Sequence, residues 1–579
     1  MSVTEQWSSK KTFILATIGS AIGLGNIWRF PFKCYENGGS SFLIAYVIAL
    51  LIAGVPAIMM ELSLGHKYRL SAPYALSKWK KGTQWVGWWA VLISFLVVCY
   101  YMVIMAWALN YSVFATDLSW GNEPGDFFFN QYLHISDGPF HLGSVQLPVL
   151  IALLISWVFV LLSIWKGAKT VSKVVYLTVV LPWVLLLVFV YKGVTLPGAH
   201  LGLIYYLKPH FETLADPKVW MAAFGQVFYS LSIGFGIMMA YARSLPKGSD
   251  VIGSALIIAL ADAATAFIGG FAVFGCLGYY AQASGQAVSE VLKGGVGLAF
   301  VTYPTIINSL PASWLFGVMF FLMLLTLAVD SAFSLVEALA NGLVDKFGWK
   351  HRKAIISIAV LGIAIGLIFT TQAGLYWLDI VDRWLEFFGV AVIVLLECFI
   401  VSWLGKADKL RKYANSFSDI KFARWWDILV KFLIPAVLIA LIISDGLNLY
   451  KNGYGDYPKK ALLIGGWIPV FLLPVIAIII GSSSKKEKIE EQKVIYPKHD
   501  FLGRKGFTRF YNYLYGLLVA GVIVAVIGLA APALLTVALT TYLILALLGG
   551  AIYFSIVTSR ENEVRKEWAQ EKLDYSGEE

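Results

Sequence analysis

Glycine residues interrupt a hydrophobic segment between Ala21 and Pro31, which reads A-I-G-L-G-N-I-W-R-F-P. Inside a lipid bilayer such an interruption is tolerated only where the freed backbone groups face protein, ligand or water. The half-helix after the break begins with free N–H groups, which attract anions, and the half-helix before it ends with free C=O groups, which attract cations. The segment therefore predicts a binding site for a small, polar, charged solute.

A second interruption lies at 230–236, where the sequence reads S-L-S-I-G-F-G inside the sixth hydrophobic run. Two interrupted helices at corresponding positions indicate an internal repeat, and an odd number of spans per repeat inverts the second copy in the membrane. Glycines that only allow close helix packing are the alternative. Two breaks five spans apart favour the repeat.

The elements that must position these breaks follow from the composition. Hydrophobic residues make up 59% of the 579 residues and charged residues only 14%, which is typical of a polytopic membrane protein. Segments of about 20 apolar residues recur along the chain. We expect an all-α membrane protein with about 12 core transmembrane helices, in a 5+5 inverted repeat with helices 1 and 6 broken, and an extra C-terminal hairpin. The expected divisions are residues 1–200, 201–405, 406–484 (helices 11 and 12) and 485–579.

The net charge of +10 comes from Lys and Arg residues in short connectors. The segment 114–146 contains neither residue. This alternation follows the positive-inside rule, and it disfavours binding of nucleic acid. It predicts a plasma (inner) membrane protein with both termini in the cytoplasm. The four cysteines fall in apolar segments, so no disulfide framework is expected.

Four separated motifs resemble one family. They are G-L-G-N-I-W-R-F-P at 23–31, E-N-G-G at 36–39, F-Y-S-L-S-I-G-F-G at 228–236 and V-D-S-A-F at 329–333. In these motifs and their order, residues 7–480 resemble the neurotransmitter:sodium symporters, particularly the bacterial amino-acid transporters. The resemblance implies a sodium-coupled symporter that imports a hydrophobic or aromatic amino acid across the lipid bilayer by alternating access.

The resemblance also implies the substrate site. Family members that carry monoamines have an Asp at the position of Gly23, so the glycine favours a solute that brings its own carboxylate. Backbone N–H groups near Leu24 and Gly25 would bind that carboxylate. The full expected set is Ala21, Gly23, Leu24, Gly25, Val97, Tyr101, Tyr229, Ser230, Ser232, Phe235, Ser331 and Leu335.

Two sodium sites are implied in the same way, because a cation inside a membrane must exchange its water for protein oxygens. The first would use Ala21, Asn26, Ser230, Asp262 and the substrate carboxylate, so that ion and substrate bind better together. The second would use Gly19, Ile22, Leu327, Asp330 and Ser331.

Asp262 departs from the family, in which Asn is typical at this ion-site position. Some relatives bind chloride nearby, and others carry a Glu one turn further along, where this chain has Ala266. The remaining matches to that anion pocket are Tyr46, Gln226 and Ser230. Because Asp262 supplies a negative charge itself, we expect transport to be independent of chloride.

The resemblance implies a gate on each side. Arg29 and Asp382 match the outer charge pair. On the inner side the family's Arg and Tyr are replaced by Thr4 and Ser244, while the acidic partner Asp345 is present. We expect Arg243 to supply the missing cation, with Lys10 as the alternative. Glu61, Glu337 and Glu397 are expected to support the interrupted backbone through hydrogen bonds.

Enzyme classes are disfavoured, because no nucleophile elbow, phosphate loop or metal-ligand spacing of histidines occurs. Two alternatives remain open: a nutrient sensor that transports slowly, with 482–579 as its output, and a symporter of a GABA-like or amine solute. The sequence does not decide between a monomer and a dimer, nor which amino acid is carried.

Overall fold

The computed structural model describes residues 7–208, 211–246, 248–285, 288 and 297–483. Within those residues the chain is helical apart from connectors and one isolated β-bridge between Val145 and Thr371. The expected all-α architecture is confirmed. The basic connector and hairpin expected within 485–579 lie outside the described residues.

Ten helical stretches of the described chain are long and apolar enough to cross a membrane. They are Ser40–Tyr68 (α3, η2 and α4), Gln84–Phe114 (α6), Leu147–Ile164 (α8), Ala168–Thr195 (α9 and α10), Val251–Ser284 (α14), Ser313–Phe347 (α17), His351–Thr370 (α18 and η6), Gly374–Leu404 (α19, η7, α20 and η8), Trp425–Asn452 (α22, η9 and α23) and Lys459–Ser482 (α24, η10 and α25). Shorter helices include α5 (Ala72–Trp79), α7 (Pro124–Asp126), α11 (Ala199–Leu207), α16 (Tyr303–Asn308) and α21 (Ala407–Phe417).

The first span is broken where the glycines predict it. Helix α1 (Lys10–Ala21) begins at Ser9, whose side chain accepts a hydrogen bond from the Thr12 amide. The chain resumes at η1 (Gly25–Arg29), which continues into α2 (Phe30–Glu36). The two halves are bent by 52°. Residues between them expose backbone groups that a straight helix would satisfy internally.

The sixth span is broken between α12 (Pro217–Ser230) and α13 (Ile237–Ala242). Ser232, Gly234 and Gly236 have φ angles of +53°, +84° and +73°. Left-handed backbone of this kind ends a helix and favours glycine. A Cβ at Gly234 would also lie 2.7 Å from Val394 on the neighbouring α20 (Ala391–Phe399), so this position excludes a larger side chain.

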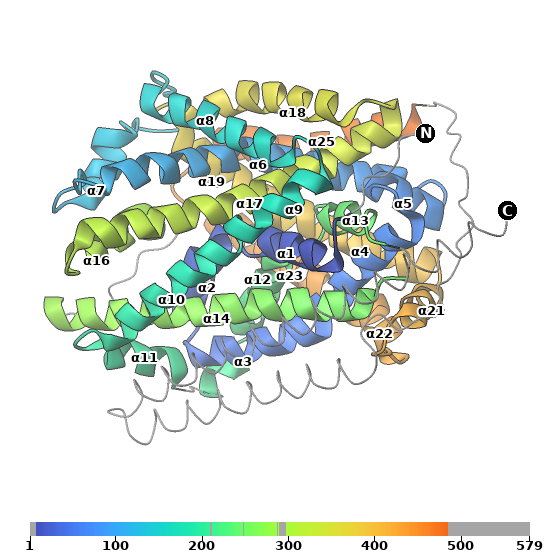
Figure 1. Ribbon diagram of the computed structural model, residues 1–579, viewed down its shortest axis with the longest axis horizontal. Coiled ribbons are helices and arrows are strands. Elements are labelled where there is room, and N and C mark those ends of the chain that lie inside the picture. Colours follow the sequence, from blue (N-terminus) through green and yellow to red (C-terminus); the bar gives the residue numbers. More distant parts are fainter. Residues whose placement is uncertain (1–6, 209–210, 247, 286–287, 289–296, 484–579) are drawn as a thin grey trace, which may run out of the picture. The chain divides into compact units, whose positions relative to one another are not determined.

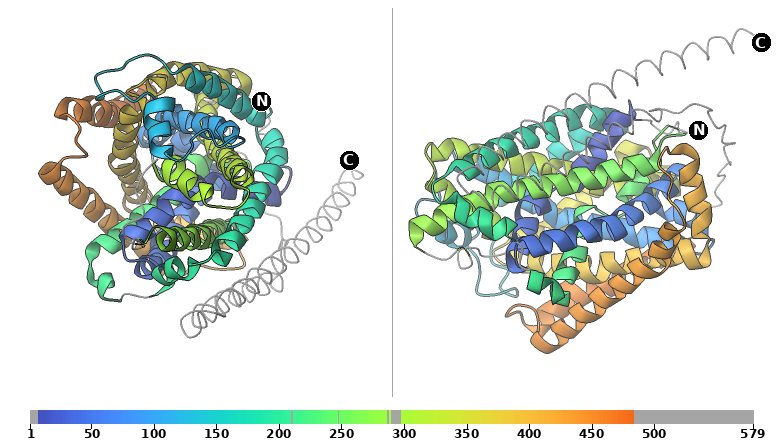
Figure 2. Two further views of the ribbon diagram at one scale, coloured as in Figure 1. Left: turned by 90° about the vertical axis from the view of Figure 1, so that its left-hand side faces the viewer. Right: turned by 90° about the horizontal axis from the view of Figure 1, so that it is seen from below.

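Long helices surround the two broken spans. Figure 1 shows α6, α17 and α14 running the length of the bundle, with α1 and α12 between them. Most residues of α1 are buried. By contrast α23 (Ile434–Asn452) and α25 (Ile468–Ser482) lie at the periphery in both views of Figure 2. Their spans expose many apolar side chains, such as Phe471 and Ile479, as expected for surfaces that face lipid.

Of the described residues, 248–253 and 414–421 belong to a second unit. Within it, Asp250 accepts hydrogen bonds from the Gly253 amide, at 2.8 Å, and from the Ser418 hydroxyl. The other residues described here belong to the first unit.

Candidate substrate and ion sites

A cavity of about 550 Å³ joins the two breaks. Its inner wall includes Gly23 and Leu24 from the first break and Ser232 from the second. Its outer wall extends to Asn448, an exposed residue of α23, so the cavity reaches the protein surface. The backbone groups freed by the breaks therefore face space that a solute can enter.

The first break presents its amides at the bottom of this cavity. The Gly23 amide donates to the Asn26 side-chain oxygen at 3.0 Å, whereas Leu24 and Gly25 open the next half-helix, where N–H groups have no partner from their own helix. A Cβ at Gly23 would lie 2.8 Å from the Ser331 Oγ, and one at Gly25 would lie 2.6 Å from the Tyr229 ring. The glycines keep this end of the cavity open.

Side chains expected around the solute also line the cavity. They are Val97, Tyr101, Tyr229, Ser230, Ser232, Phe235, Ser331 and Leu335, together with the backbone of Ala21. The hydroxyl of Tyr101 is buried beside the Ser331 hydroxyl and the Leu24 backbone, without a well-formed hydrogen bond to either. A phenol left without a partner in this place can donate to a bound carboxylate.

Part of the cavity wall is more polar than the sequence predicted. Ser20 Oγ donates to Ser334 Oγ at 2.8 Å, and Ser232 Oγ donates to the Ser20 carbonyl at 3.1 Å. Both Ser20 and Ser334 line the cavity. Sequence analysis missed them because serine in an apolar helix also occurs where its hydroxyl only bonds back to its own backbone.

Asp262 lies at the centre of a buried polar cluster. Asn26 Nδ2 donates to its carboxylate at 2.8 Å, Ser230 Oγ lies 2.8 Å from one oxygen and 2.9 Å from the other, and the Tyr46 hydroxyl lies at 3.5 Å. The structure thus brings three members of the expected first sodium site together from three different spans. No basic side chain pairs with Asp262 in the described part of the chain.

The other two residues expected in the anion pocket, Ala266 and Gln226, make no hydrogen bond to the Asp262 side chain. Ala266 follows Asp262 by one turn of α14 and is buried. The Gln226 amide is buried, and neither its nitrogen nor its oxygen makes a hydrogen bond within the described residues. Of the residues expected in this anion pocket, Tyr46 and Ser230 make hydrogen bonds to Asp262.

The second expected sodium site has a carboxylate oxygen without a partner. Asp330 is fully buried, its Oδ1 accepts from Thr178 Oγ1 at 2.5 Å, and its Oδ2 makes no hydrogen bond to any described residue. That oxygen would lie 2.4 Å from a Cβ at Gly19. An orphaned buried carboxylate oxygen is costly unless a cation or a proton neutralises it.

The structure places the remaining expected ligands of this second site at the first break and on α17. Ile22 lies in the first break and Leu327 is buried on α17 one turn before Asp330. Ser331 lines the solute cavity. Thr178 is an addition that the sequence did not reveal, because its distance from Asp330 along the chain hides the contact. The Asp330, Asp262, Thr178 and Ser230 side chains offer oxygens, which fit sodium, whereas Asn26 presents its amide nitrogen to Asp262. Among the described residues, no cluster of three His, Cys, Asp or Glu side chains is suited to a metal.

The cavity mouth carries a charge pair that differs from the expected one. Arg29 donates two hydrogen bonds to Glu386, and its guanidinium carbon lies 4.0 Å from the centre of the Tyr229 ring. Asp382 instead accepts from the Tyr100 hydroxyl at 2.5 Å. The expected pairing of Arg29 with Asp382 is thus replaced by one with Glu386, one helical turn further along. Both acids lie on the same face, so sequence spacing alone does not select between them.

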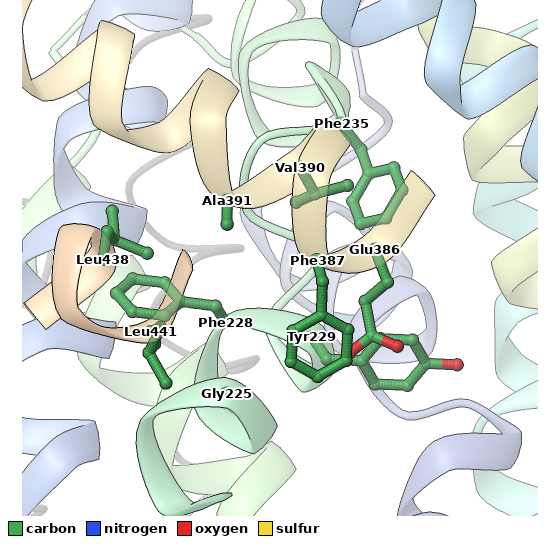
Figure 3. A pocket seen from close by; sticks show the side chains of 10 residues that line it. All are labelled: Gly225, Phe228, Tyr229, Phe235, Glu386, Phe387, Val390, Ala391, Leu438 and Leu441. Atoms are coloured by element: carbon green, nitrogen blue, oxygen red, sulfur yellow. The ribbon is translucent and has the colours of Figure 1, made fainter. Parts of the chain in front are cut away.

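A small apolar pocket lies behind this charge pair (Figure 3). Figure 3 shows Phe387 beside Tyr229 and Glu386, with Leu438 and Leu441 of α23 on the far side. Tyr229, Phe235, Glu386 and Phe387 line both this pocket and the solute cavity. These four side chains therefore form the wall between the two spaces.

Two tyrosines bind Asp379, an acid that lines the cavity together with Tyr454. The hydroxyls of Tyr454 and Tyr457 donate to the two oxygens of Asp379, each at 2.9 Å. Burial, and then the Asp379 charge, raise the pKa of both phenols. Both tyrosines therefore stay protonated as donors at neutral pH.

The opposite end of the two broken spans is closed by a charge pair. Arg243, directly after α13, donates to the Asp345 carboxylate of α17 at 3.0 and 3.1 Å, and Ser71 donates to the same carboxylate through its amide and hydroxyl. The buried Trp7 indole donates to the Tyr241 carbonyl at 3.0 Å. The structure thus brings together the cation and the acid that the sequence analysis paired.

Comparison with known proteins supplies an independent finding. A sequence profile of the sodium:neurotransmitter symporter family matches residues 4–124 and 121–486. An uncharacterized sodium-dependent transporter of Methanocaldococcus jannaschii is 42% identical over 478 residues, which is 82% of this chain and 97% of that protein. A sodium- and chloride-dependent GABA transporter 2 of Rattus norvegicus is 34% identical, over 79% of this chain and 82% of its own. A sodium-dependent dopamine transporter of Caenorhabditis elegans is 32% identical, over 80% of this chain and 84% of its own.

Proposed function

The chain belongs to the sodium:neurotransmitter symporter family, and from that premise we propose that it imports an amino acid together with sodium by alternating access. Family membership makes it a sodium-dependent, multi-pass membrane transporter and not an enzyme. The observation that carries the finer proposal is the first break, whose amides at Leu24 and Gly25 face a cavity beside Tyr101.

An amino acid suits this cavity at both of its charged ends. Its carboxylate would accept hydrogen bonds from the amides of Leu24 and Gly25 and from the Tyr101 hydroxyl. Its ammonium would lie against the carbonyls of Ala21 and Tyr229 and the Ser232 hydroxyl. Val97, Phe235 and Leu335 would contact a hydrophobic or aromatic side chain.

A GABA-like solute is the second candidate, and the serine wall favours it. Ser20 Oγ donates to Ser334, so its own lone pairs stay available as acceptors for a distant amine. The kinship with the rat GABA transporter supports testing this class as well.

Two sodium ions would be held by the oxygens around Asp262 and around Asp330. Ala21, Asn26 and Ser230 would complete the first site; Gly19, Ile22, Leu327 and Ser331 would complete the second. Sodium supplies positive charge next to an anionic solute, so that each binds better with the other present. We propose that chloride is not required, because the Asp262 carboxylate already lies where Tyr46 and Ser230 point their hydroxyls.

The gates would be Arg29 with Glu386 and Asp382 on the outer side, and Arg243 with Asp345 on the inner side. The basic connectors support an orientation with the Arg243 side facing the cytoplasm. A cavity that reaches the surface near Asn448 while the Arg243–Asp345 pair is closed corresponds to an outward-facing state.

Equilibrium binding tests the substrate class. Purified protein in lipid nanodiscs would be titrated with labelled amino acids, GABA and monoamines, in sodium or in potassium. We expect saturable binding of one amino-acid class in sodium only. Sodium-dependent binding of a monoamine in preference to every amino acid would overturn the proposal.

A further inference from the structure

Two glutamates meet inside the bundle, apart from both expected sodium sites. Glu61 of α4 (Val55–Tyr68) and Glu397 of α20 have no exposed surface. The break between α12 and α13 touches both helices, because the Cβ position of Gly234 lies 2.7 Å from Val394, one turn before Glu397 on α20. The two carboxyl groups are close enough to interact electrostatically. Glu61 Oε1 also accepts the Gly234 amide at 2.6 Å, which connects the pair directly to the break between α12 and α13.

Three of the four carboxyl oxygens lack a donor. Glu61 Oε2 and both oxygens of Glu397 make no hydrogen bond to any other described group. No Lys, Arg or His within the described chain forms an ion pair with either glutamate. The Cys398 thiol, next to Glu397 on α20 itself, is a further titratable group that interacts with both carboxyls.

The charge of the glutamate pair determines whether a proton or a metal cation must bind there. Two ionised carboxylates this close, in a dry interior, repel each other and lose their hydration, so they cannot both be charged without a cation. A single proton shared by the two carboxyl groups removes one of the two negative charges and requires no other residue to move. A protonated Glu397 donates to the free Oε2 of Glu61, while Glu61 Oε1 continues to accept from Gly234.

We propose that Glu61 and Glu397 form a proton-binding site whose occupancy is linked to the conformation of the α12–α13 break. Loss of the proton leaves two negative charges beside Gly234, which changes the hydrogen bond that holds the break. Gly234 lies between Ser232 and Phe235, and both of these residues line the solute cavity. Proton occupancy therefore biases the solute site without contact with the solute.

Infrared spectroscopy tests proton occupancy without any transport assay. The protein in lipid nanodiscs at pH 7 would be compared with the Glu397→Gln variant. We expect the wild type to show a carboxylic-acid C=O absorption that the variant lacks and that shifts in heavy water. The Glu36→Gln variant is the matched control, because Glu36 is exposed and paired with Lys33, so only carboxylate bands should change.

Three results would overturn the proposal. One is loss of carboxylate bands alone in Glu397→Gln, which would mean that both acids are ionised. Another is a glutamate band that responds to exchange of sodium for potassium, which would assign the pair to a metal cation. If Glu397→Gln does not fold, the Glu61→Gln variant replaces it, since its amide oxygen can still accept from Gly234. The proton then stays on Glu397, whose C=O band should persist at a shifted frequency, and a C=O band that is unchanged in Glu61→Gln is the third result.

The link to the break has a second readout. Affinity for the labelled amino acid in saturating sodium would be measured from pH 5 to pH 9. We expect about a fivefold or larger change in the wild type and a flattened profile in Glu397→Gln. An unchanged profile in the variant would contradict the link. Because the infrared measurement uses no solute, its outcome is separate from the success or failure of the proposed function.

Discussion

Arg243 and Asp345 join the end of the second broken span to α17 through two hydrogen bonds of 3.0 and 3.1 Å. Both side chains are mostly buried, with 8% and 11% of their surface exposed. Removal of one partner from a buried pair leaves a charge without compensation, at a cost of about 3–5 kcal/mol. The pair therefore stabilises the state in which this end is closed.

The Arg243→Ala variant should shift the conformational equilibrium toward opening at this end. Thiol reagents should then label single cysteines in the inner pathway faster than in the parent protein. Lys412→Ala is a suitable control, because its pair with Asp408 is exposed and contributes little. Equal labelling rates in the Arg243 variant and in this control would remove the gate assignment.

The outer charge pair predicts which of two acids, Glu386 or Asp382, contributes more to closure over the bound solute. Glu386→Gln should weaken closure over bound solute more than Asp382→Asn does, because Arg29 donates to Glu386 and not to Asp382. Faster dissociation of the labelled solute in the Glu386 variant is the expected measurement. A larger effect from Asp382→Asn would show that the pairing changes when the gate closes.

Both helix breaks and the inner charge pair can be predicted from the sequence. Glycines at 23, 25, 234 and 236 predict both breaks because left-handed or freed backbone needs them. The Arg243–Asp345 contact is predicted by the family resemblance, because Asp345 lacks its usual cation in this chain and Arg243 adjoins the replaced position Ser244.

Other contacts require the folded chain. Glu386 and Asp382 are equivalent by helical spacing, and only the folded position of Arg29 beside η7 (Leu385–Val390) selects one. Thr178 reaches Asp330 across 152 residues of sequence, and the Glu61–Glu397 contact joins even more distant helices. Sequence analysis expected all three buried glutamates to bond to interrupted backbone. Glu61 does so, whereas Glu337 faces His351 at 2.8 Å and Glu397 faces Glu61.

Gly19 provides a steric test of the second sodium site. The Gly19→Ala methyl group would lie 2.4 Å from Asp330 Oδ2, so the carboxylate must move. We expect at least about tenfold weaker sodium affinity, equivalent to about 1.4 kcal/mol, in sodium-dependent solute binding. Gly225→Ala is the control, because nothing lies within 4 Å of its Cβ position. Matching sodium affinities in the two variants would exclude this site.

Gly23 provides the corresponding test of the carboxylate end. In Gly23→Ala the new methyl group would lie 2.8 Å from Ser331 Oγ and narrow the cavity. The affinity for the amino acid should fall by about tenfold or more, about 1.4 kcal/mol, while Gly446→Ala, whose Cβ position is 4.0 Å from its nearest neighbour, should bind normally. Equal affinities would place the carboxylate elsewhere.

Asp262 predicts a gain of chloride dependence on substitution. In Asp262→Asn the fixed negative charge is lost, and the Tyr46 and Ser230 hydroxyls become available to an external anion. Transport by this variant should be slow in gluconate and should recover with chloride. A variant that is equally active, or equally inactive, in both salts would contradict this role of Asp262.

Uptake into proteoliposomes tests the central claim most directly. An inward sodium gradient would be imposed with a panel of labelled amino acids, with and without chloride, and with potassium in place of sodium as the control. We predict accumulation above equilibrium of one amino-acid class, driven by sodium and unchanged by removal of chloride. Sodium-dependent binding without accumulation would contradict transport and favour a sensor, and uptake that rises steeply with chloride would contradict the role given to Asp262.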